Sequence, residues 1–107
     1  MAYLEATHKW TFTSTGTGKF QPLGACQSVT FGILPSESCT ATVQILHRMG
    51  STSEAGAPTV LSTVACATTN TMVTDQFLGP LEYVAPRVVD KTAGGTTNTV
   101  TVWVRTV

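Results

Sequence analysis

Apolar and polar residues alternate one by one through most of this chain, which is the period of a β-strand with two different faces. No segment of ten or more residues repeats its apolar positions at the 3.6-residue spacing of a helix. The alternation is clearest in residues 39–46, where every second residue is apolar. Four residues of this segment share the face that we assign to the core: Cys39, Ala41, Val43 and Ile45.

Seven segments of the chain alternate in this way. They are residues 8–13, 26–31, 39–46, 60–67, 71–77, 83–89 and 99–105. Residues typical of turns separate them, and we place Gly32 in the turn after the second segment. Pro86 cannot donate to a strand ladder, so the sixth segment is predicted to be an edge or bent strand.

These segments predict an all-β protein with about seven to eight strands. Short strands separated by turns are typical of an antiparallel β-sandwich or a partly closed barrel, of jelly-roll or immunoglobulin-like type. We expect residues 1–107 to form one domain, because a chain of this length buries a single thin core. Residues 1–7 show no strong pattern and are predicted to be either an extra edge strand or an arm that reaches a neighbour.

The composition supports a sheet protein with few surface charges. The chain has 21 threonines but only 12 charged residues, and threonine is β-branched and favours strands. Charged residues are 11% of the chain, whereas about 25% is typical. The net charge is zero, so little repulsion opposes self-association. No basic stripe is present, which argues against nucleic-acid binding.

The N-terminus lacks a basic region followed by an apolar run, and no apolar run approaches the roughly 20 residues that span a bilayer. We therefore expect synthesis in the cytoplasm and no membrane partner. The three cysteines are an odd number without paired spacing, so free thiols are predicted. A bond between Cys26 and Cys39, which would flank one hairpin, is the exception left open.

No catalytic or cofactor motif is present. His8 and His47 are the only histidines that could act as a base, and neither lies in a recognisable nucleophile motif. A zinc site needs about four ligands, often in close pairs, and no such pairing occurs. The six acidic residues are well separated. We therefore predict that the chain is not an enzyme and has no metal or cofactor.

Trp103 lies out of phase with the valines of its strand. Val102 and Val104 are predicted to be buried, so Trp103 is either exposed or covered by another element or subunit. Exposed large aromatic residues are candidate binding anchors, and a flat Trp can also stack on a sugar. Other apolar residues have no evident place in the core. Together with Trp103 they form the predicted partner interface: Tyr3, Leu4, Phe20, Leu23 and Trp103.

Three segments of the chain resemble small β-sandwich capsid decoration (cement) proteins of tailed bacteriophages. These are residues 39–46, 83–89 and 94–105, and the likeness consists of strand and turn patterns rather than site residues. The resemblance implies a structural virion protein on the capsid surface that binds the major capsid protein and stabilises an icosahedral head. It also implies a homo-oligomer, commonly a trimer over junctions between capsid subunits.

Three alternatives remain open at this point. The chain fits another virion component, such as a head-fibre base, a neck protein or a tail protein. It also fits a carbohydrate-binding module that uses Trp103, and a small enzyme is the third alternative.

Overall fold

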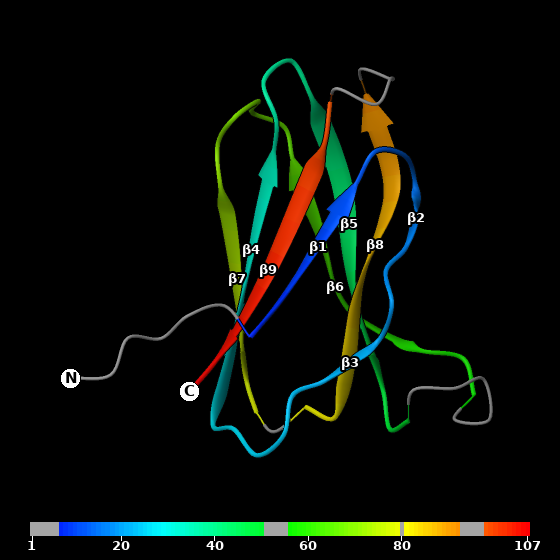
Figure 1. Ribbon diagram of the computed structural model, residues 1–107, viewed down its shortest axis with the longest axis vertical. Coiled ribbons are helices and arrows are strands. Elements are labelled where there is room, and N and C mark those ends of the chain that lie inside the picture. The colour runs from blue at the N-terminus through cyan, green and yellow to red at the C-terminus, as the bar shows by residue number, and fades with distance from the viewer. Residues whose placement is uncertain (1–6, 51–55, 80, 93–97) are drawn as a thin grey trace.

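The computed structural model describes residues 7–50, 56–79, 81–92 and 98–107, and these residues form two antiparallel β-sheets (Figure 1). They contain no helix, so none that is long and apolar enough to cross a membrane. The all-β fold class is confirmed. The strands are β1 (His8–Phe12), β2 (Gly16–Thr17), β3 (Gln21–Pro22), β4 (Ser28–Pro35), β5 (Thr40–Arg48), β6 (Thr59–Cys66), β7 (Val73–Leu78), β8 (Tyr83–Thr92) and β9 (Val100–Thr106).

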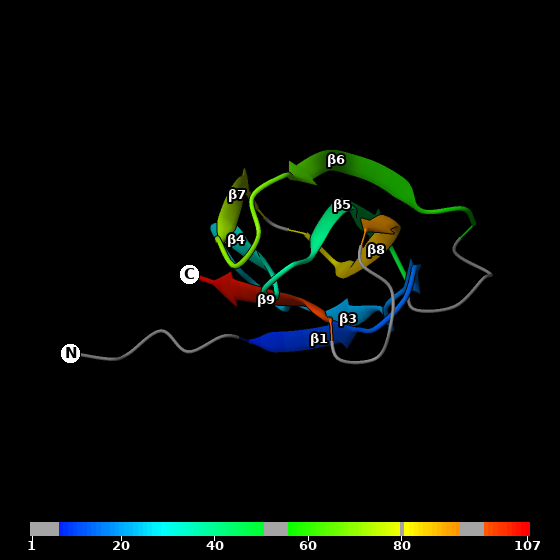
Figure 2. The same ribbon diagram turned by 90° about the horizontal axis from the view of Figure 1, so that it is seen from above.

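The two sheets face each other, as the view from above shows (Figure 2). Sheet A has the strand order β1-β9-β4-β7, and sheet B has the order β2-β8-β5-β6, with β3 also paired to β8. Each of the seven longer strands overlaps one of the seven predicted segments, although several bounds differ, most of all in β4, which extends to Pro35. The two-residue strands β2 and β3 were not predicted, because two residues cannot show an alternation.

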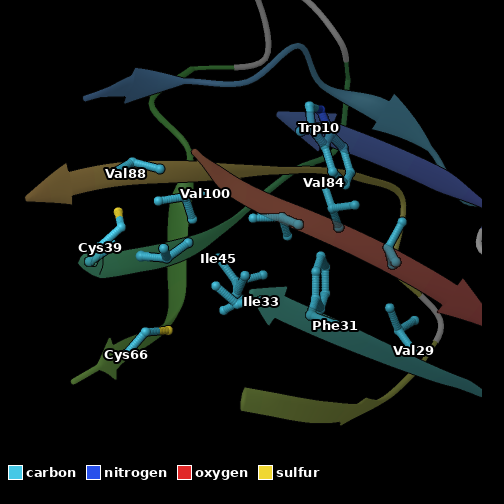
Figure 3. Packing of buried hydrophobic residues seen from close by; sticks show 14 of the residues in the cluster. Trp10, Val29, Phe31, Ile33, Cys39, Ile45, Cys66, Val84, Val88 and Val100 are labelled. Carbon is cyan, nitrogen blue, oxygen red and sulfur yellow. The ribbon is translucent and has the colours of Figure 1, made fainter. Parts of the chain in front are cut away.

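The core lies between the sheets and is built from the inward residues of the long strands (Figure 3). Phe31 of β4 and Ile45 of β5 are completely buried, and Phe31 packs edge-to-face on Phe77 with ring centroids 5.9 Å apart. No polar or charged residue in the described part of the chain is buried. The residues that the alternation assigns to the core are all buried: Cys39, Ala41, Val43, Ile45, Val102 and Val104.

Side-chain hydrogen bonds connect the edges of the two sheets. On one side, Trp10 Nε1 of β1 donates to the carbonyl of Lys19, and His8 Nε2 donates to the carbonyl of Pro22, both at 2.8 Å. On the other side, Ser62 Oγ of β6 donates to Asp75 Oδ2 of β7 at 2.5 Å. An inward charge such as Asp75 on an edge strand also discourages pairing with other chains. The sandwich is therefore connected at both of its open sides.

The segment with Pro86 is predicted to be an edge or bent strand, and the first alternative, an edge strand, is wrong; the pairing of β8 with β5 does have a register irregularity, between Thr42 and Val43. β8 lies inside sheet B, with β5 on one side and the short strands β2 and β3 on the other. β2 pairs with residues 87 and 88 and β3 with residues 83 and 84, so Pro86 lies opposite the gap between them. Its carbonyl accepts from the Gly18 amide at 2.9 Å. A proline is tolerated there because its missing N–H faces no strand partner.

The register can be tested by placing a charge on the inner face of β9. We expect Val102→Asp to lower the free energy of unfolding by about 3–5 kcal/mol, because the new carboxylate would be buried without a partner. Arg105→Asp is the matched control, since Arg105 lies exposed on the outer face of the same strand and should change stability by only about 0.5 kcal/mol. Urea denaturation measures both. Equal stabilities of Val102→Asp and wild type would contradict the register.

Candidate functional site

A hollow of about 380 Å³ lies on the outer face of sheet A, which is the face turned away from the core. We call it the Gly32 hollow, because Gly32 of β4 pairs with Trp103 of β9 on one side and Thr74 of β7 on the other. Its volume falls at the lower end of the range of about 300–1,000 Å³ seen for ligand pockets. The residues that line it are Thr30, Gly32, Met72, Thr74, Trp103 and Arg105.

The hollow exists because one outward position of a central strand has no side chain. Phe31 and Ile33 point inward and are fully buried, so the residue between them points outward. A Cβ atom at position 32 would lie 3.2 Å from Met72 Sδ, so the Met72 side chain lies directly above this backbone. Gly32, Met72 and Trp103 all line the hollow, with Met72 packed over the Gly32 backbone.

The prediction that Gly32 lies in a turn is wrong, because β4 continues through it to Pro35. This is also why sequence reasoning missed the hollow. The sequence does indicate that Gly32 lies inside a strand, since Phe31 and Ile33 continue the alternation on both sides of the glycine. A glycine inside a strand often marks a place where a ligand or another backbone approaches closely.

Trp103 lies on the outer face, opposite Val102 and Val104, as the alternation predicts. It is only partly covered. Lys9 of β1 pairs with Trp103 in the strand register, and its Nζ lies 6.0 Å from the centroid of the Trp103 ring. This distance is at the outer limit of a cation–π contact. The Lys9 ammonium therefore lies over the indole ring, and Trp103 also lines the Gly32 hollow.

The outer face of sheet A carries charge of a single sign. Among its outward strand residues, Lys9 and Arg105 are the only charged ones, and no acidic side chain accompanies them. Asp75, the one acid of these four strands, points inward to Ser62. Threonines make up much of the remaining face: Thr11, Thr30, Thr74 and Thr101. An acidic group would find complementary charge here and no repulsion.

The other predicted interface residues do not join Trp103. Leu23 is 7% exposed and belongs to the hydrophobic core, so the expectation that it lies outside the core and is free for a partner is wrong. Phe20 is half-buried, and the Arg48 guanidinium carbon lies 4.7 Å from its ring centroid, next to sheet B. Tyr3 and Leu4 lie outside the described residues. So does the rest of the predicted arm of residues 1–7, apart from Thr7.

Both histidines are held by backbone groups. His8 Nε2 donates to the carbonyl of Pro22, while His47 Nε2 accepts from the Glu82 amide at 3.1 Å. In the described part of the chain, no three residues among His, Cys, Asp and Glu lie close enough together to hold a metal ion. The histidines therefore connect neighbouring segments of the sandwich.

The three cysteines are free, as the sequence predicts, and the pair left open, Cys26 with Cys39, is not bonded. Cys39 and Cys66 are buried, whereas Cys26 is half-exposed. Burial raises the pKa of the Cys66 thiol, because desolvation disfavours the thiolate. A buried thiol of raised pKa is a poor nucleophile, so Cys66 is a small apolar residue of the core.

No family of known proteins matches the chain, and neither a curated protein nor a solved structure matches it. The resemblance to phage decoration proteins consequently stays a prediction. The physical observations that bear on function are the position of Trp103, the Gly32 hollow beside it and the charges on the same face.

Thiol labelling tests the cysteine assignment. In the native protein, a thiol reagent should react first with Cys26, and labelling of Cys66 should rise only at a pH above that of an ordinary thiol, since its pKa is raised. In denaturant without reductant, three thiols should be counted. A count of one under those conditions would mean that two of the cysteines are bonded.

Proposed function

We propose that this chain is a structural virion protein, a capsid decoration protein that binds the major capsid protein of a tailed bacteriophage through the outer face of sheet A. The observation that carries the proposal is a partly exposed Trp103 beside the Gly32 hollow, on a sheet face whose described strand residues include only two charged side chains, Lys9 and Arg105. The resemblance of three segments to decoration proteins supplies the class of partner.

The outer face of sheet A has the features of a protein-binding surface. Tryptophan is enriched among the residues that contribute most to binding, and such anchors insert into well-packed pockets of a partner. Met72, which lines the same hollow as Trp103, is 48% exposed, so apolar area adjoins the anchor. The threonines on this face are stiff at χ1 and lose little side-chain freedom when they are covered.

Oligomerisation would strengthen weak contacts of this kind. The net charge of zero gives the chains little mutual repulsion, and we propose a trimer, as in the decoration proteins that the sequence resembles. Linked copies that bind together gain about 10²–10⁴ in avidity over one copy. Sedimentation equilibrium of the purified protein measures the oligomeric state directly.

The direct test is binding to capsids that lack this protein. Capsids assembled from the major capsid protein encoded in the same genome are mixed with the purified chain and pelleted over a range of salt concentrations. We expect saturable binding at a fixed ratio of copies to capsid subunits, weakened only mildly by salt, because exposed charges are few and screened. Absence of the chain from the pellet, or a ratio that never saturates, would reject the proposal.

Substitution of the anchor should separate binding from folding. Trp103→Ala should weaken capsid binding by at least about 2 kcal/mol, or roughly 30-fold, because it removes the aromatic anchor. Val60→Ala is the control, since Val60 is an exposed apolar residue on β6 of sheet B. Binding is measured by pelleting and folding by circular dichroism. If Trp103→Ala and Val60→Ala weaken capsid binding equally, the outer face of sheet A has no special role in it.

One observation favours a second candidate, a carbohydrate-binding module. The Gly32 hollow combines the Trp103 ring with the hydroxyl groups of Thr30 and Thr74, and a sugar ring can stack on an indole while its hydroxyls form hydrogen bonds. Screening against a glycan array distinguishes the two. Selective glycan binding that Trp103→Ala abolishes, without capsid binding, would favour the module.

A further inference from the structure

Gly32 is placed where a glycine costs stability. It lies in the interior of β4, and β4 has a paired neighbour on each side within sheet A. Glycine in a strand interior is unfavourable, because it loses more conformational freedom on folding and packs no side chain. The described glycines with left-handed φ angles are Gly16, Gly24 and Gly56, so the backbone at position 32 does not require glycine. The missing side chain leaves room for the Met72 side chain, whose Sδ would lie 3.2 Å from a Cβ at position 32, and for the hollow that both residues line.

This space is large enough for a substantial side chain of another molecule. About 380 Å³ corresponds to roughly a dozen water molecules at about 30 Å³ each. The hollow is lined by the rigid indole of Trp103, by backbone at Gly32 and by the flexible, half-exposed side chain of Met72, which lies over that backbone. Methionine adapts its shape to what packs against it and contacts aromatic rings favourably. An aromatic or large aliphatic group would therefore find apolar surface to contact there.

The charged side chains that the structure describes around the hollow are positively charged hydrogen-bond donors. Arg105 lines it, and the Lys9 Nζ lies 6.0 Å from the centroid of the Trp103 ring, which also lines it. Both side chains can donate hydrogen bonds and neither can accept one, so they complement a carboxylate, which only accepts. A sugar presents hydroxyl hydrogens as well, and the lining offers only the Thr30 and Thr74 hydroxyls to accept them. The charges thus favour an acidic protein segment over a neutral sugar.

We propose that the Gly32 hollow receives one aromatic or large aliphatic side chain from an exposed segment of the partner protein, with an aspartate or glutamate of that segment placed beside Arg105 and Lys9. This inference rests on the proposed function for its partner, and it adds which chemistry the partner must present. Trp103 then acts as a wall of the receptor, and Gly32 determines which groups fit.

Filling the hollow tests the proposal without weakening the sheet. Gly32→Val introduces a strand-favouring side chain, and the atom it meets first is the Sδ of the half-exposed Met72, which can move away. We expect a melting temperature equal to or above that of wild type. Gly32→Ala is the milder second variant if valine is not tolerated. Thr63→Val is the matched control, because it adds a β-branched apolar residue on exposed β6.

The probe is a displayed library of random peptides, selected on the wild-type protein and counter-selected on folded Gly32→Val. We expect enriched peptides that combine an aromatic or large aliphatic residue with a nearby Asp or Glu. Their affinity should fall at least tenfold with Gly32→Val and stay unchanged with Thr63→Val. Arg105→Gln should weaken the same peptides several-fold and reduce the dependence of their binding on salt.

Three outcomes would overturn the inference: no peptide that distinguishes wild type from Gly32→Val, enriched peptides that are neutral or basic, or a glycan that competes for the hollow. Capsid pelleting separates this inference from the proposed function. If Gly32→Val pellets with capsids as wild type does, the decoration function stands and the hollow has no role in it. If peptides are selected as expected but the wild-type protein does not pellet with capsids, the Gly32 hollow is still a peptide-binding site and the proposed decoration function is rejected.

Discussion

The structure depends on the burial of apolar side chains between two pairs of strands. β4 and β9 form one side of this core, and β5 and β8 form the other. Phe31, Ile45 and Val102 have no exposed surface, and no polar side chain in the described residues is buried with them. Burial of apolar area is the main favourable term in folding. Because the core is only one layer thick, each strand has one face that packing fixes and another that packing leaves free.

The thin core makes the open sides of the sandwich important. Trp10 packs into the core with its ring and donates its Nε1–H to the carbonyl of Lys19, so one side chain contributes both burial and a link between the sheets. Gly18 allows this arrangement, since a Cβ there would lie 2.6 Å from Trp10 Cδ1. The hydrogen bond from Ser62 to Asp75 links the two sheets on the opposite side, and it does so through polar groups alone. The two sheets are therefore held in register at both sides, and their outer faces keep a fixed shape.

A fixed outer face is what a binding site of this kind requires. Trp103 and Gly32 lie on neighbouring strands whose inward residues are fully buried, so their separation is set by the core beneath them. A preorganised surface loses little freedom on binding, and more of the contact energy appears as affinity. The proposed receptor thus follows from the same packing that stabilises the fold, and the strand glycine that opens it reduces stability at that position.

The sequence by itself determined the strands and which face of each enters the core, because a period of two residues is a local property that packing between two sheets rewards. It could therefore place Trp103 on an outer face. Only the tertiary structure decided what lies beside it: the pairing of Gly32 with Trp103 joins residues from distant parts of the chain, and alternation carries no information on which strands are neighbours. The same limit explains Leu23 and Pro86. Leu23 belongs to a core whose members come from distant parts of the chain, and Pro86 is tolerated inside a sheet because the gap between two short strands lies opposite it.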